Sequence, residues 1–384
     1  PYPLIVGAPV IFEAAATYST ATVFDSNSNK VVISYRDVGN SSYGTSVVGT
    51  VSGTTITFGT PVVFETASVN HLRATFDSNS NKVVIVYSDV GNSSYGTAIV
   101  GTVSGTSISF GTAVVYNSSG ISDSGVTFDS TNNKVVIAYQ HNTNSNYGTA
   151  IVGTVSGTAI SFGTDVVFET ASVASVAATF DSANNKVVIA YKDEGNSSYG
   201  TAIIGTVSGT AISFGTAAVF EAASTTYITA TFDSNANKVA IAYKDNGTTY
   251  GTAVVGTVSA TSISFGTAVV FETASTNNST ATFDSSSNRV VISYTDAGNS
   301  SHGTSIAGTI SGTSISFGTP VVFEATSTTY ITATFDSVNN KTVTAYQNSA
   351  TYGSAVVSNI PNLLTIGTDY FVQSDGSLST TSST

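Results

Sequence analysis

One tripeptide, Phe-Asp-Ser, recurs at a nearly fixed interval along almost the whole chain of 384 residues. Successive copies lie 52 residues apart, except for a single interval of 51. A repeat of this length indicates that one small structural unit is copied, and that each unit buries its apolar face against the next one. The seven copies of the motif begin at Phe24, Phe76, Phe128, Phe180, Phe232, Phe283 and Phe335.

Each copy contains four runs of residues that favour β-strands. In the second copy these runs are residues 73–77, 82–87, 95–103 and 108–116, rich in β-branched and aromatic side chains. Clusters of Asp, Asn, Ser and Gly separate the runs, as turns require. No segment has the period and end signals of a helix, so we expect almost no helix. The pattern predicts an all-β protein, a seven-bladed β-propeller of four-stranded blades.

The two ends of the chain predict how such a propeller closes. Residues 7–13 match the fourth strand at residues 59–65, so the chain begins with a fourth strand that precedes its first Phe-Asp-Ser. We expect this N-terminal strand to complete the last blade and to pair its open edge. The propeller is therefore predicted to span residues 1–358, and residues 359–384 to form a C-terminal arm or linker or a short β-hairpin. Alternatively, this tail competes with the N-terminal strand for the edge of the last blade.

Composition excludes several kinds of partner and chemistry. Only 9% of the residues are charged, and 11 Lys and Arg stand against 23 Asp and Glu, which gives a net charge of −12. Nucleic acids and anionic membranes bind clustered Lys and Arg, so we expect neither as a partner. No run of about 20 apolar residues is present, which argues against membrane insertion. Because the chain has no Cys, thiol chemistry and thiolate metal sites are excluded, and we expect no cofactor.

An aspartate follows the phenylalanine of every copy, which leaves two interpretations. Asp25, Asn27 and Asn29 alternate along the chain as calcium ligands do. Alternatively, each Asp accepts hydrogen bonds from backbone N–H groups of its own tight turn. We favour the turn and predict no metal site, because a calcium loop also needs a distal bidentate Glu. The series is Asp25, Asp77, Asp129, Asp181, Asp233, Asp284 and Asp336.

A second acidic series recurs near the end of the fourth run, with Asn117 in place of the acid in one copy. Two carboxylates about 5–10 Å apart can hydrolyse a glycoside. A catalytic site is a unique constellation, however, so we expect these repeated residues to end a strand and face solvent, and predict no catalytic residue. The series is Glu13, Glu65, Glu169, Glu221, Glu272 and Glu324.

Repeated aromatic residues and scattered histidines are the remaining candidates. A tyrosine recurs in every second run and a phenylalanine in the fourth, and either could stack on sugars. At fixed positions they more often fill the space between blades, so we assign them to the core. His71, His141 and His302 occupy different positions in their copies, which excludes a symmetric metal ring and favours surface or loop positions.

The segment between the fourth run and the next first run varies in sequence but not in length. It reads Thr-Tyr-Ser at residues 17–19 and Val-Asn-His at residues 69–71. We expect it to form loops around the mouth of the central channel, where they would bind a ligand. Neutral drift of exposed loops is the alternative. The candidate ligand-binding residues are Tyr18, His71, Arg73, Asp123, Tyr227, Asn277 and Tyr330.

Two long motifs and the tail carry a resemblance to a known family. The motifs are Phe-Asp-Ser-x-x-Asn-Lys-Val-Val-Ile-x-Tyr and Tyr-Gly-Thr-Ala-Ile-Val-Gly-Thr-Val-Ser-Gly-Thr, and the tail is residues 366–381. They resemble repeats and C-terminal segments in large virion proteins of marine bacteriophages, cyanophages among them. The resemblance implies a non-enzymatic structural or adhesion protein at the virion surface, on a tail fibre or as a capsid or tail decoration.

The resemblance also implies the partners: other virion proteins, or a glycan or protein of the host surface. A further copy of the chain, bound through the C-terminal arm, is an additional expectation. An alternative hypothesis is a secreted or cell-surface bacterial adhesin or lectin that binds glycans with the same face. An enzyme such as a glycosidase or lyase would need one blade with unique acid and base residues. None stands out in the sequence, so we expect no enzymatic activity.

Overall fold

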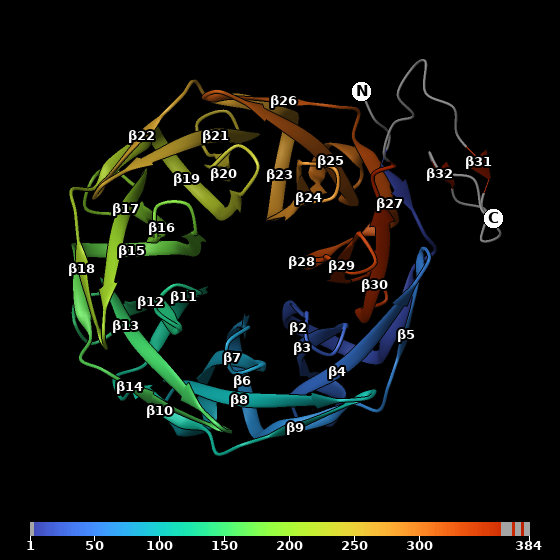
Figure 1. Cartoon of the computed structure of the whole chain (residues 1–384), viewed down its shortest axis with the longest axis horizontal. Coiled ribbons are helices and arrows are strands. Elements are labelled where there is room, and N and C mark those ends of the chain that lie inside the picture. Colours follow the sequence, from blue (N-terminus) through green and yellow to red (C-terminus); the bar gives the residue numbers. More distant parts are fainter. Residues whose placement is uncertain (1–3, 362–370, 373–377, 380–384) are drawn as a thin grey trace.

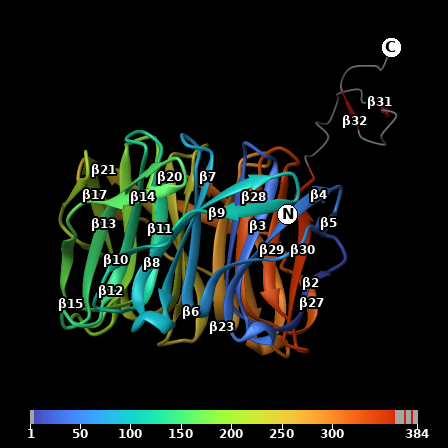
Figure 2. The ribbon, with the colours of Figure 1, turned by 90° about the horizontal axis from the view of Figure 1, so that it is seen from below.

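The computed structural model of the chain describes residues 4–361, 371–372 and 378–379. Most of these residues lie in antiparallel strands, which are arranged in a ring (Figure 1) and run between its two faces (Figure 2). The helices in this described part are short 3-10 turns, which agrees with the sequence prediction. They are η1 (Val38–Asn40), η2 (Val90–Asn92) and η3 (Ala297–Asn299).

Each sequence copy forms an antiparallel set of strands, here called a unit, whose inner strand ends at the repeated aspartate. In the second copy the carboxylate Oδ1 of Asp77 accepts hydrogen bonds from the backbone N–H groups of Asn79 and Ser80, both at 2.9 Å. The corresponding aspartates of the other copies accept the same two bonds. This confirms the turn interpretation of the repeated aspartates.

After this turn each unit continues with a second and a third strand, which pair with each other over most of their length. The second strands are β3 (Lys30–Asp37), β7 (Lys82–Asp89), β12 (Lys134–His141), β16 (Lys186–Asp193), β20 (Lys238–Asp245), β24 (Arg289–Asp296) and β29 (Lys341–Gln347). The third strands are β4 (Tyr43–Ser52), β8 (Tyr95–Ser104), β13 (Tyr147–Ser156), β17 (Tyr199–Ser208), β21 (Tyr250–Ser259), β25 (His302–Ser311) and β30 (Tyr352–Asn359).

Long strands join one unit to the next. The first half of β6 pairs with the third strand of one unit, and its second half is the inner strand of the following unit. The uninterrupted long strands are β2 (Val10–Asp25), β6 (Val62–Asp77), β15 (Val166–Asp181), β19 (Ala218–Asp233) and β23 (Val269–Asp284). The interrupted ones are β10 (Val114–Asn117) with β11 (Ile121–Asp129), and β27 (Val321–Ser327) with β28 (Thr329–Asp336).

The two interruptions divide the strands into two large antiparallel sheets of 13 and 17 strands. Strand pairing is therefore not continuous around the ring. The inner strands nevertheless contact one another in sequence order across both breaks, β6 with β11 and β23 with β28, and β28 contacts β2.

The outer edge of each unit differs from the sequence prediction. Residues 108–116 were expected to form one strand, but β9 and β10 are separate pieces that pair with opposite ends of β8. The strand is interrupted from Gly111, where an added Cβ would lie 1.9 Å from the carbonyl oxygen of Thr158 in the next unit. The short outer strands are β5 (Thr55–Phe58), β9 (Ser107–Phe110), β14 (Ala159–Phe162), β18 (Ala211–Phe214), β22 (Ser262–Phe265) and β26 (Ser314–Phe317).

The N-terminal strands lie against the last unit, as the sequence predicts. In β1 (Ile5–Val6), Val6 pairs with Ser358 of β30, and the first half of β2 pairs with the other end of that strand. Between them the backbone N–H of Gly7 donates to the carbonyl of Val357 at 2.9 Å. Beyond the ring, β31 (Phe371–Val372) and β32 (Leu378–Ser379) pair antiparallel, which agrees with the predicted hairpin. The predicted contact between copies through the arm concerns residues that lie mostly outside the described part.

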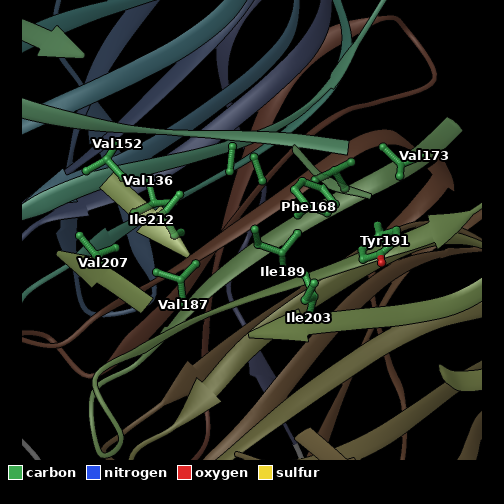
Figure 3. Packing of buried hydrophobic residues seen from close by; sticks show 13 residues of the cluster. Val136, Val152, Phe168, Val173, Val187, Ile189, Tyr191, Ile203, Val207 and Ile212 are labelled. Carbon is green, nitrogen blue, oxygen red and sulfur yellow. The ribbon is translucent and has the colours of Figure 1, made fainter. Parts of the chain in front are cut away.

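The core lies between adjacent units. Figure 3 shows one such cluster, in which Val136, Val152 and Phe168 of one unit pack with Ile189 and Tyr191 of the next. The tyrosine of every second strand is 0% exposed, and the repeated phenylalanines of the short outer strands are half-buried at the edges of these clusters. The assignment of the repeated aromatic residues to the core is thereby confirmed.

Candidate functional site

A bulge interrupts the pairing of each inner strand five residues before the repeated phenylalanine. In β2, for example, the register shifts between Tyr18 and Ala21. In six copies the residue at this position has a left-handed φ of 50–52°, although none of them is Gly. Bulges re-aim side chains, and left-handed non-Gly residues mark local constraint. The seven bulge positions hold Ser19, His71, Asp123, Ser175, Tyr227, Asn278 and Tyr330.

All seven bulge residues line one cavity of about 510 Å³, at the place where the inner strands meet. Each copy also contributes the small residues that follow its bulge, mostly Ala and Thr. A volume of this size accommodates an organic ligand. The cavity therefore has a repeated, small-residue wall and a rim whose side chain changes from copy to copy.

The prediction that this variable segment forms loops is wrong for most copies. In β2, β6, β15, β19 and β23 it lies inside one continuous strand. The chain leaves the outer edge of one unit and continues directly as the inner strand of the next, so its backbone is paired on the way. The bulge, and not a loop, presents the variable residue, because it directs one variable side chain per copy towards the cavity.

One side of the cavity carries charge. Arg73 on β6 places Nη2 3.6 Å from Oδ1 of Asp123 on β11, and its Nη1 donates to the carbonyl of Leu72 at 2.8 Å. The side chains of Arg73 and Asp123 are 40% and 20% exposed. His71 lies beside this pair, so the expectation that it is merely a surface or loop residue is wrong. Its bulged backbone turns it to the cavity instead.

A second arginine extends the charged side. Arg36 on β3 donates from Nη1 to Oδ1 of Asn70 at 2.5 Å, which ties two neighbouring units together. Its guanidinium carbon lies 4.7 Å from the ring centroid of Tyr18, in a cation–π contact. Arg36 does not line the cavity, but it adds positive charge close to His71.

Two other positions on the rim are aromatic. Tyr227 on β19 and Tyr330 on β28 are 40% and 38% exposed, whereas most large hydrophobic side chains of the ring are buried. The ring of Tyr18 packs edge-on against that of Tyr330, with centroids 5.3 Å apart. An exposed tyrosine held by a second ring offers a flat apolar face with a polar tip.

The structure brings together five of the seven predicted site residues. His71, Arg73, Asp123, Tyr227 and Tyr330 line the cavity. The other two lie one position before the bulge and support its rim: Tyr18 packs on Tyr330, and Asn277 accepts a hydrogen bond from Nζ of Lys244 at 3.1 Å. Sequence reasoning missed Ser19, Ser175 and Asn278, which an alignment of the copies on Phe-Asp-Ser would have placed at the same position.

The repeated glutamates do not face solvent, which corrects the sequence interpretation. Glu169 is half-buried within β15, and its Oε2 accepts the hydroxyl of Tyr191 in the following unit at 3.1 Å. Burial, reinforced by this carboxylate, raises the pKa of Tyr191, so the phenol remains a donor. The same bond recurs at Glu13, Glu65, Glu221, Glu272 and Glu324.

In the copy without the glutamate, Asn117 takes its place. Its Nδ2 donates to the hydroxyl of Tyr139 at 3.4 Å, and that hydroxyl donates to Oδ2 of Asp165 at 3.4 Å. The exception to the series is therefore compensated by other hydrogen bonds to the tyrosine hydroxyl. Within the described residues, no three or more His, Asp or Glu side chains gather as a metal site would require.

His71 makes a pH-dependent contribution to stability. Burial lowers its pKa from the ordinary 6.5; Arg73 and Arg36 act in the same direction, and Asp123 opposes them. The unfolded chain therefore binds a proton at a higher pH than the folded chain, and stability falls as the pH drops through about 6.5. The variant His71→Ser carries the residue found at the equivalent positions 19 and 175. Its urea midpoint of unfolding should fall less between pH 7 and pH 5 than that of the wild type. The same fall in both proteins would exclude this role of His71.

Comparisons with known proteins give the fold class. No protein-family model matches the chain, and no curated protein sequence matches it. Among solved structures it is similar to the BP39L lectin from Burkholderia pseudomallei, with a TM-score of 0.64, 10% sequence identity, and coverage of 90% of this chain and 96% of the lectin. It is also similar to AofleA from Arthrobotrys oligospora, with a TM-score of 0.53, 10% identity, and coverage of 82% and 91%.

At this identity the likeness concerns the fold alone: the chain is an all-β repeat protein of the β-propeller type. No helix in the described part is long and apolar enough to span a membrane.

Proposed function

We propose that the chain is a closed, seven-bladed β-propeller that binds carbohydrate at its central cavity without enzymatic activity. The closed ring is supported by the pairing of β1 and β2 with β30, which gives the last unit an outer edge like that of the others. It is also supported by the contact between the inner strands β28 and β2.

The observation that carries carbohydrate binding is the composition of the rim. Two half-exposed tyrosines, Tyr227 and Tyr330, line the same cavity of about 510 Å³ as the polar group of His71, Arg73 and Asp123. Sugar rings present C–H faces that pack on aromatic rings and hydroxyls that need charged or amide partners. The fold is compatible, since a lectin is among the similar structures.

The acidic residues support a binding protein rather than a glycosidase. Hydrolysis of a glycoside needs two carboxyl groups flanking the bond. Asp123 is the one carboxylate among the described residues that line the cavity. The repeated aspartates and glutamates hold turns and tyrosine hydroxyls instead.

A glycan array followed by calorimetry tests the proposal. Tyr227→Ala and Tyr330→Ala should each weaken binding of any glycan found by at least about tenfold, the loss expected for one stacking contact of about 1.4 kcal/mol. Val338→Ala, at the turn on the other end of β28 from Tyr330, is the matched control and should leave affinity unchanged. Full binding by both tyrosine variants, or no glycan bound at all, would contradict the proposal.

A place on a phage particle or on a cell surface stays a prediction. None of the comparisons points to a phage origin. Mass spectrometry of purified particles tests it: peptides of this chain within virions would support display on a phage, and their absence would favour the bacterial adhesin or lectin hypothesis.

A further inference from the structure

The positive charges of this acidic chain follow two patterns. Seven of its 11 Lys and Arg residues open a second strand, directly after the aspartate turn. The remaining four are Arg36, Arg73, Lys192 and Lys244. Three of these lie near the opposite end of a second strand, and Arg73 lies on the cavity wall. The seven are Lys30, Lys82, Lys134, Lys186, Lys238, Arg289 and Lys341.

Arg73 has hydrogen-bonding capacity directed at the cavity. Its Nη1 donates to the carbonyl of Leu72, but its Nη2 lies 3.6 Å from Asp123, beyond hydrogen-bond distance. The side chain is 40% exposed and lines the cavity. A guanidinium in this state can donate parallel N–H groups to a planar carboxylate.

The surroundings of Arg73 include a second arginine. Arg36 donates to Asn70, which directly precedes His71, and in the described part its buried Nε has no hydrogen-bond partner. Among the described residues that line the cavity, Asp123 is the one acidic side chain. Two guanidinium groups therefore lie on this side of the cavity, in a protein whose total charge is −12.

We propose that the cavity takes an acidic saccharide, whose carboxylate binds Arg73 while a sugar ring stacks on one of the rim tyrosines. This inference rests on the proposed carbohydrate binding and names its substrate class. The long-range field of an acidic chain repels an anion, and salt screens that field beyond about 8–10 Å. Recognition must therefore come from direct contact with the arginine.

Substitution of Asp123 tests the proposal, because an acidic and a neutral ligand predict opposite changes in affinity. If the ligand is acidic, the carboxylate of Asp123 competes with it for Arg73, so Asp123→Asn should raise affinity at least about threefold. If the ligand is neutral, Asp123 is an acceptor for a sugar hydroxyl, and the same change should lower affinity. Asparagine keeps an Oδ1 for the bond that Ser124 N–H donates at 2.9 Å, so the local backbone is preserved.

The experiment measures binding of the wild type and of Arg73→Gln, Arg73→Lys, Asp123→Asn and Tyr330→Ala. The probes are oligogalacturonates with their methyl esters, and sialyllactose with lactose, chosen as acidic and neutral pairs. We expect the wild type to prefer at least one acidic member by tenfold or more. Arg73→Gln should abolish this preference, Arg73→Lys should keep part of it, and Tyr330→Ala should weaken both members of the pair.

The outcomes separate this inference from the proposed function. Equal binding of acidic and neutral members, lowered by Tyr330→Ala and by Asp123→Asn, would overturn the acidic ligand and leave carbohydrate binding standing. A wild type that binds none of these probes would overturn the acidic ligand. If it also binds nothing on the glycan array, carbohydrate binding fails as well.

Discussion

A chain that lacks residues 1–13 is expected to lose at least about 5 kcal/mol of its free energy of unfolding, because truncating a single buried Phe already costs about 3–5 kcal/mol. Phe12 is 8% exposed, and its ring packs against that of Tyr35 with centroids 5.2 Å apart. Glu13 accepts the hydroxyl of Tyr35 at 3.1 Å. The deletion also removes β1 and leaves β30 with an unpaired edge, which invites aggregation.

Urea and thermal denaturation followed by circular dichroism measure this loss. A chain that lacks residues 374–384 is the control, because the described contacts of the ring are made within residues 4–361. We expect that control to unfold within about 0.5 kcal/mol of the full chain. Equal losses for the two truncations would show that the N-terminal strand does not stabilise the last unit.

Gly163→Ala is expected to lower the free energy of unfolding by about 3 kcal/mol or more, the upper range for overpacking. A Cβ at this position would lie 2.0 Å from the carbonyl oxygen of Thr210, in the turn between β17 and β18 of the next unit. The neighbour is backbone and cannot rotate away. Gly163 is itself held, since its N–H donates to the carbonyl of Val152 at 2.9 Å.

Gly157→Ala is the matched control for this substitution. Gly157 has a φ of 62°, and an added Cβ would meet nothing within 4 Å. The chain already contains the variant, because Ala260 occupies the equivalent position with a φ of 54°. The expected cost is about 1 kcal/mol, from the left-handed backbone alone. Equal costs at positions 157 and 163, again from denaturation midpoints, would show that contact between units is not the cause.

Local sequence predicted the strands well where one strand belongs to one unit. The run at residues 82–87 became β7, and the run at residues 95–103 became β8, each within two residues. Local sequence failed for the outer edge, where one strand was expected at residues 108–116. The interruption between β9 and β10 depends on the close approach of Gly111 to the backbone of the next unit. A sequence pattern within one copy carries no signal for that contact.

Variation between copies singled out His71 and Tyr227, which the structure places at the cavity, because constant segments build the repeat and variable ones do not. Their role in binding stays a prediction. Nothing in a Ser, His or Tyr signals a left-handed bulge, so a loop was expected instead. The partner of Glu169 was also missed, since Tyr191 follows 22 residues later and reaches it only through the fold.

The long strands have a consequence for how such a chain can grow or be rearranged. Because β6 belongs to two units, no cut at its centre releases an intact module, whereas a cut in the aspartate turn at residues 78–81 leaves every long strand whole. Circular permutation should therefore be tolerated where the new ends lie in one of these turns, and not where they lie within a long strand. Duplication or deletion of the gene segment is less restricted, because a segment of one full repeat restores a long strand at its junction wherever it starts.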